Sequence, residues 1–209
     1  MSPPPAIDAI FADNRLHRSA DLAAAGLSRM AIKRAADAGR IIQYARGVYV
    51  SAEGLATTGI SLAATSLLLQ GVVCLGSAAQ FHGLSDEDPP EIWYAVDRGR
   101  NGNMAAPSIR QPHRLVWWPA ELLEVGVNTV QIAGVDVRFT SPARTVVDLI
   151  RYRGKLGEET AAKALADYVR SGADLNEIWD IAEAIGVKDA LTPFLRVAEE
   201  LAPSIAALR

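Results

Sequence analysis

Basic side chains recur at helical spacing in one short stretch near the start of the chain. Arg29, Lys33 and Arg40 fall on one side of a predicted helix at spacings of four and seven residues, and Arg34 lies beside them. Small residues such as Ala35 fall on the opposite side, which lets the helix pack closely. A cationic helix face can meet the phosphates and base edges of a DNA major groove. The pattern therefore indicates a nucleic-acid contact, with a plain solvated charged face as the alternative.

Another basic residue lies in the stretch that follows this helix. Arg46 and Gly47 interrupt two apolar runs, one at Ile41 and Ile42 and the other from Val48 to Val50. This arrangement predicts a small β-hairpin with a basic tip. A hairpin of this size needs other elements to pack on. We expect it to lie against the preceding helices and to direct Arg46 toward a DNA backbone or minor groove.

Serine and glycine residues mark where the helices around this stretch begin and end. Ser19 and Ser28 each precede a helical pattern, and a hydroxyl at that position can cap the helix or meet a phosphate. Gly26 and Gly39 suit the C-terminal ends of the same helices. Together with a helix over residues 5–14, the order predicts a winged helix-turn-helix. The predicted DNA contacts are Ser19, Ser28, Arg29, Lys33, Arg34, Arg40 and Arg46.

The charge of the chain is unevenly distributed. Residues 1–50 contain seven basic and four acidic side chains, whereas the remaining residues contain 14 basic and 20 acidic ones. A basic segment joined to an acidic body fits contact between that segment and a polyanion. A chance fluctuation in composition explains the same numbers equally well.

Several classes of protein do not fit the composition. Cys74 is the only cysteine, so no internal disulfide can form, and the three histidines are too far apart in sequence to suggest zinc. The longest apolar run, residues 66–75, is too short to span a bilayer. The N-terminus lacks the pattern of a signal peptide. We expect a cytoplasmic protein with no membrane partner, no cofactor and no metal.

The rest of the chain predicts a different architecture. An apolar helix over residues 57–70 is followed by short strands and one further helix up to residue 140. Another helix begins at Pro142, and the tail from Glu158 has helical patterns. The fold class is therefore α+β: an N-terminal winged helix-turn-helix, then an α+β domain with a mixed or antiparallel sheet and a helical C-terminal tail. We place the DNA-binding domain at residues 1–55 and the second domain at residues 56–209.

The Gly76-Ser77 pair stands between a predicted strand and a predicted helix. A similar pair opens nucleotidyltransferase sites, which also need two acids one residue apart on the next strand to hold a divalent cation. Asp86 and Asp88 have this spacing, but they precede the strand. We therefore favour a helix N-cap as the role of Ser77. A divergent transferase site at Ser77, Asp86 and Asp88 is the alternative.

Arg144 and Asp148 are four residues apart on the helix that begins at Pro142. An ordinary intrahelical ion pair, worth a few tenths of a kcal/mol, is the favoured interpretation. A pair that locks the domain or contacts a partner is the alternative.

Three stretches together resemble a known family. They are "RSADLAAAGLSRMAIKRAADAGRIIQYARGVYV", "GSAAQFHGL" and "TSPARTVVDLI". In this order they resemble the AbiEi-type antitoxins and transcriptional regulators of bacterial type IV toxin–antitoxin systems. The resemblance implies a winged helix that binds inverted repeats in its own promoter. It also implies a C-terminal domain that counters a nucleotidyltransferase-like toxin, without catalytic activity at the Gly-Ser segment.

Two other functions stay open at the level of sequence. One is a divergent nucleotidyltransferase fused to a DNA-binding domain. The other is a winged-helix regulator whose second domain senses a ligand. The favoured hypothesis is a DNA-binding antitoxin and autorepressor that is not an enzyme, with double-stranded DNA and a cognate toxin as its partners.

Overall fold

The computed structural model describes residues 7–99 and 111–206, with side chains through Glu199. Within these residues the chain forms two compact units. The first unit takes in residues 7–70, 111–112 and 130–137, and the second takes in residues 71–99, 113–129 and 138–206. The boundary that the sequence predicts between residues 55 and 56 stays a prediction; the first unit itself runs on through Gln70.

The first unit begins with short helices and a hairpin. Its elements up to residue 70 are α1 (Ile7–Phe11), β1 (His17–Arg18), α2 (Ser19–Ala24), α3 (Arg29–Asp37), β2 (Ile42–Ala45), β3 (Val48–Val50), the 3-10 turn η1 (Gly54–Ala56) and α4 (Ile60–Leu69). The three strands form an antiparallel sheet with β3 in the middle. Three helices followed by a hairpin is the winged helix-turn-helix order, so the predicted fold of this segment is confirmed.

Strand β1 was not predicted from the sequence. It has two residues, and its pairing of His17 with Tyr49 and of Arg18 with Val48 depends on a strand thirty residues further along the chain. The three helices could be predicted, because their apolar residues recur at helical spacing and form the core of this unit. Phe11, Leu22 and Ile32 come from three successive helices and are all buried together.

A five-stranded mixed sheet follows in the order β6-β5-β4-β8-β7. Its strands are β4 (Val72–Val73), β5 (Ile92–Asp97), β6 (His113–Trp118), β7 (Val127–Ile132) and β8 (Val135–Thr140). Strand β4 runs antiparallel to β5 and parallel to β8, whereas β5 runs parallel to β6. The prediction of a mixed sheet is confirmed. Residues 130–137, around the turn between β7 and β8, belong to the first unit.

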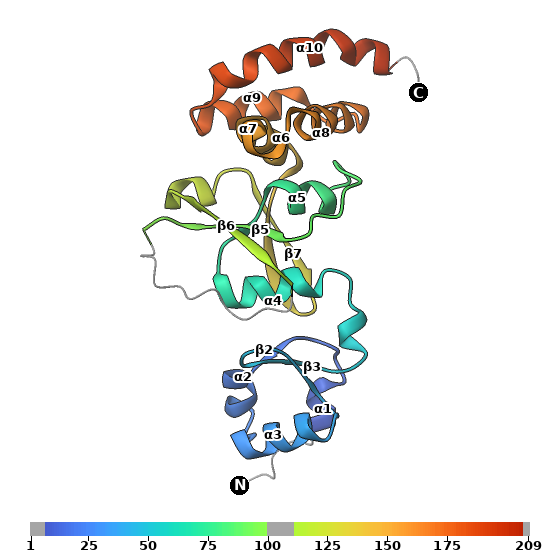
Figure 1. The fold of residues 1–209 in the computed structure, drawn as a ribbon, viewed down its shortest axis with the longest axis vertical. Coiled ribbons are helices and arrows are strands. Elements are labelled where there is room, and N and C mark those ends of the chain that lie inside the picture. The colour runs from blue at the N-terminus through green and yellow to red at the C-terminus, as the bar shows by residue number, and fades with distance from the viewer. Residues whose placement is uncertain (1–6, 100–110, 207–209) are drawn as a thin grey trace. The chain divides into compact units, whose positions relative to one another are not determined.

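Helices make up most of the second unit. They are α5 (Leu75–Phe81), the 3-10 turn η2 (Ala120–Leu123), α6 (Pro142–Arg151), α7 (Arg153–Leu156), α8 (Glu158–Arg170), α9 (Leu175–Ala184) and α10 (Lys188–Ala206). The predicted helical tail is therefore confirmed. Figure 1 shows α6 to α10 gathered together, and α6 packs on α5, α8, α9 and α10. Ser141 caps α6 by accepting a hydrogen bond from the backbone N–H of Arg144.

Helix α6 is the central element of the second unit. Every side chain from Ala143 to Ile150 is buried, so this helix is surrounded by protein on all sides. Among the residues that the structure describes, no helix combines the length and the apolar composition that crossing a membrane requires.

Candidate nucleic-acid interface

Helix α3 presents a buried face and an exposed basic face. The hydroxyl of Ser28 accepts a hydrogen bond from the backbone N–H of Ala31 at 3.1 Å, which fixes the first turn of the helix. Ile32 and Ala35 are buried in the core of the first unit, and they hold this side of α3 against the other helices. The opposite side of the helix is therefore exposed to solvent.

The predicted cations are all exposed, but they have different surroundings. The ammonium of Lys33 lies 2.7 Å from a carboxylate oxygen of Asp37, and the guanidinium of Arg40 lies 3.5 Å from a carboxylate oxygen of Asp8. Within the described part of the chain, Arg29, Arg34 and Arg46 form no ion pair. These three cations can meet a phosphate without giving up a protein partner.

The hairpin of β2 and β3 positions Arg46 at its turn. Gly47 adopts a positive φ of 74°, a conformation that glycine takes without strain. The carbonyl of Gly47 accepts a hydrogen bond from the backbone N–H of Ser19 at 2.8 Å, so the turn is tied to the start of α2. Arg46 is thus exposed at a turn that the neighbouring helix holds in place.

The predicted cap role of Ser19 is wrong. Helix α2 begins at Ser19 itself, its N-cap residue is Arg18, and no side chain caps it. The backbone N–H of Ser19 is already used by the carbonyl of Gly47, which leaves only its exposed hydroxyl for a phosphate. Ser28, by contrast, caps α3 as expected and keeps its hydroxyl hydrogen available as a donor.

Met30 is a member of the exposed face of α3 that the sequence analysis missed. Its side chain is 59% exposed, although the residue is large and apolar. Lys33 and Arg34 follow it at spacings of three and four, so all three lie on one face of the helix. The spacing can be read from the sequence, but a search for basic side chains alone does not find Met30.

The alternative transferase residues are each engaged by a separate partner. The hydroxyl of Ser77 accepts a hydrogen bond from the backbone N–H of Trp93 at 3.0 Å, and the residue lies inside α5 rather than at its N-cap. The predicted N-cap role of Ser77 is therefore wrong. Asp86 pairs with Lys163 at 3.0 Å, whereas Asp88 accepts a hydrogen bond from Gln80. Among the described residues, no group of three His, Cys, Asp or Glu side chains could hold a metal ion.

The Arg144–Asp148 pair is an intrahelical ion pair, as favoured, but it is fully buried. The Nε of Arg144 donates to Asp148 at 2.8 Å, and its Nη1 donates to the carbonyls of Leu122 and Val125. The guanidinium also lies over the ring of Trp118, 4.7 Å from its centroid. Arg144 therefore ties α6 to the segment between β6 and β7. Burial raises the pKa of Asp148 to about 6, against the opposing effect of the Arg144 charge.

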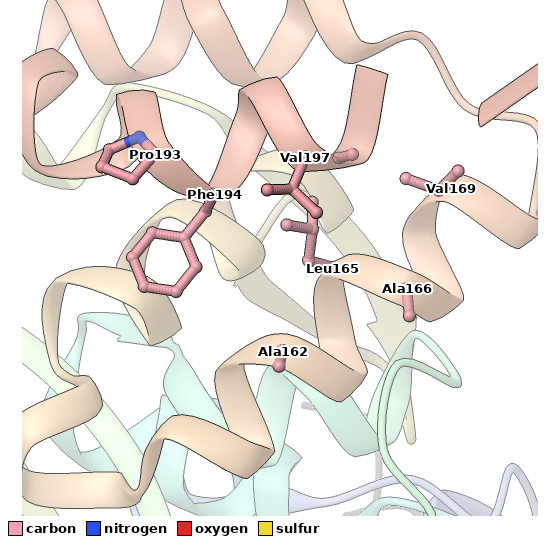
Figure 2. A pocket seen from close by; sticks show the side chains of 8 residues that line it. Ala162, Leu165, Ala166, Val169, Pro193, Phe194 and Val197 are labelled. Carbon is pink, nitrogen blue, oxygen red and sulfur yellow. The ribbon is translucent and has the colours of Figure 1, made fainter. Parts of the chain in front are cut away.

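A pocket of about 420 Å³ lies between α8 and α10 in the second unit. Figure 2 shows Leu165, Val169 and Phe194 around it, and every residue that lines it is apolar. Small-molecule sites usually add a few polar groups that orient the ligand. This pocket offers apolar contact without that orientation.

Its fold places the N-terminal segment of the first unit in the class of winged-helix proteins. Residues 6–52 match a family described as transcriptional regulator, AbiEi antitoxin, and residues 71–192 match the AbiEi antitoxin C-terminal domain. The chain belongs to the AbiEi antitoxin family. The resemblance drawn from the three sequence stretches is confirmed.

A solved structure illustrates the shared fold. The crystal structure of the RV2827C protein from Mycobacterium tuberculosis matches with a TM-score of 0.52 and 14% sequence identity, covering 88% of this chain and 75% of that one. Among curated proteins, none matches the chain. At this identity the structural match speaks for the fold alone.

Proposed function

We propose that this chain is an antitoxin that binds DNA, represses its own promoter and counters a nucleotidyltransferase-like toxin. The observation that carries the DNA-binding part is the exposed face of α3, where Arg29 and Arg34 lie without an ion pair among the described residues. In winged-helix proteins this helix enters the major groove. Membership in a family of antitoxin regulators supports the rest of the proposal.

We assign the DNA contacts to α3 and to residues near it. Arg29, Lys33 and Arg34 of α3 meet base edges and phosphates of the major groove, while Arg40 and Arg46 meet the backbone beside it. The hydroxyls of Ser19 and Ser28 donate to phosphates. Lys33 and Arg40 exchange a carboxylate partner for a phosphate in this complex, so each contributes less net affinity than an unpaired cation.

The proposed target is a set of inverted repeats in the promoter of the protein's own gene. An inverted repeat presents two equivalent half-sites, which two copies of a winged helix can occupy symmetrically. Such binding takes place in the bacterial cytoplasm, the compartment that we propose for the protein.

The second unit is the proposed antitoxin part. Its match to the AbiEi antitoxin C-terminal domain supports this assignment. The ligand-sensing alternative has one observation in its favour, the apolar pocket between α8 and α10, but the pocket lacks orienting polar groups. The transferase alternative is not favoured, because Ser77, Asp86 and Asp88 are each engaged by separate partners.

Separate readouts of repression and growth test the proposal. The full-length protein is expressed from an unrelated promoter beside the product of the neighbouring toxin gene and a reporter driven by its own promoter. The parent protein should silence the reporter and restore growth. The double variant Arg29→Ala with Arg46→Ala should lose repression and keep growth rescue, because both changes lie in the first unit. Loss of rescue at an equal protein level would contradict the division of roles.

A further inference from the structure

Met30 is the most exposed large apolar side chain in the described part of the chain, with 59% of its surface accessible. It is the second residue of α3. Lys33, Arg34 and Asp37 follow it at spacings of three, four and seven, and all four side chains are exposed on the same face. An apolar side chain therefore lies within the charged surface that we assign to DNA.

The fold does not account for this placement. The buried side of α3 is filled by Ile32 and Ala35, and the core of the first unit is built without Met30. Single exposed apolar residues are common on proteins, so exposure alone carries little weight. The position of Met30 is stronger evidence, because residues at the N-terminal end of a recognition helix contact base edges in the major groove.

The chemistry of the side chain restricts what it can recognise there. A thioether donates no hydrogen bond and accepts one only weakly, so it cannot match the polar atoms of a base edge. The 5-methyl group of thymine is the apolar feature that the major groove offers. Methionine is unbranched and polarisable, which lets it adapt to such a group.

We propose that Met30 reads a thymine methyl group in the major groove of the bound DNA. This inference rests on the proposed DNA-binding function and adds a specificity-determining contact to it. In this arrangement Arg29 and Arg34 supply affinity through phosphates and polar base atoms. Met30 supplies a preference for thymine over cytosine at one position of each half-site.

The test uses two versions of the promoter fragment of the protein's own gene, one made with thymine and one with uracil throughout. Uracil removes only the methyl group and keeps the base pairing. Full-length parent, Met30→Leu and Met30→Ala proteins are titrated against both duplexes. The parent and Met30→Leu should bind the thymine duplex about fourfold more tightly for each methyl group contacted. Met30→Ala should bind both duplexes with nearly equal affinity.

Arg46→Ala is the matched control. It should weaken binding to both duplexes and leave their affinity ratio as in the parent, because a wing cation does not touch the methyl group. The comparison of ratios forms a double-mutant cycle, which cancels any general effect of uracil on the duplex. An exposed side chain outside the core is also a safe site to change without unfolding the protein.

Three results would overturn the inference. If Met30→Ala keeps the parent's ratio, the methyl group is read by another residue or Met30 faces another partner. If the parent binds the two duplexes equally, no methyl group is read at all. If the parent binds neither duplex, the proposed DNA-binding function fails and the inference fails with it, which separates that case from the first two.

Discussion

The ion pair between Arg144 and Asp148 lies on α6 with both side chains fully buried. Arg144 also donates to the carbonyls of Leu122 and Val125, whereas its Nη2 and the Oδ1 of Asp148 are buried without a hydrogen-bond partner among the described residues. A buried pair is costly to assemble, yet removing one partner is worse, because the other charge stays buried alone. Arg144 is therefore a structural residue of the second unit.

Replacing Arg144 by methionine should lower the free energy of unfolding by about 3–5 kcal/mol. The change removes the partner of Asp148 and the link from α6 to the segment before β7. Lys188→Met is the matched control, because it breaks an exposed pair with Glu183 and should cost less than about 1 kcal/mol. Denaturant titration of both variants makes the comparison. An equal loss of unfolding free energy in the two variants would show that burial of the pair does not increase its contribution to stability.

Asp148 also gives the stability a pH dependence with a definite sign. Burial raises the pKa of its carboxyl from 3.8 to about 6 in the folded chain. Between these values the folded state holds the proton more tightly than the unfolded state, so this group's contribution to stability falls as the pH rises through that window. Other carboxyl groups also exchange protons in this pH range, so a variant is needed to isolate the contribution of Asp148.

The Asp148→Asn variant serves as that reference. The free energy of unfolding of the parent minus that of Asp148→Asn should be larger near pH 4 than near pH 7, with most of the change below about pH 6. Urea titrations at a series of pH values measure this difference. A difference that grows as the pH rises would mean that the charge of Arg144 lowers the pKa of Asp148 by more than burial raises it.

At the scale of elements, the wing has a role distinct from that of α3. Its turn is fixed by the bond from Ser19 to Gly47, and Arg46 points from it into solvent without an ion pair among the described residues. A wing tip mostly meets the backbone or senses groove width, neither of which carries much base information. Arg46 should therefore contribute affinity more than sequence preference.

Arg46→Ala should weaken binding to the promoter fragment and to a scrambled duplex by a similar factor. Fluorescence anisotropy with both duplexes at one salt concentration measures the two affinities. Selective loss of promoter binding, with unchanged affinity for the scrambled duplex, would give Arg46 a base-reading role and contradict this assignment.

The elements that the sequence predicted are those with local signals. Helix α3 begins at a serine cap and ends before a glycine, and the hairpin after it has Arg46-Gly47 at its turn. Strand β1 escaped prediction because two residues carry no period, and only pairing with β3 defines it. Ser77 was misplaced because the helix begins at Leu75, earlier than its glycine suggests.

The site could be predicted in part for a similar reason. The spacing of Arg29, Lys33 and Arg34 is local, and their exposure follows from the apolar residues opposite them. The pairing of Arg40 with Asp8 joins residues far apart in sequence, so no local pattern indicates it. The burial of Arg144 and Asp148 is likewise a tertiary property, since an i,i+4 pair has the same spacing on a surface and in a core.

At the scale of the whole molecule, the first fifty residues carry the excess of basic side chains and the rest of the chain is acidic. The first unit extends beyond those residues. Within it, the backbone N–H of Leu16 donates to the carbonyl of Ala133, and the hydroxyls of Tyr44 and Ser61 share a hydrogen bond of 2.8 Å. A fragment ending at residue 55 would lose these bonds, so the full chain is the appropriate material for DNA-binding experiments.

The central claim is that the exposed face of α3 binds DNA, and titration of the promoter fragment at several salt concentrations tests it most directly. The affinity of the full-length parent should fall steeply with salt, because its cations displace counterions from phosphates. Arg29→Ala should weaken binding by about 1–3 kcal/mol if Arg29 reads a base edge, or flatten the salt slope by about one if it meets a phosphate. Lys188→Ala, in the acidic second unit, should match the parent. Full affinity for Arg29→Ala together with a loss for Lys188→Ala would contradict the account.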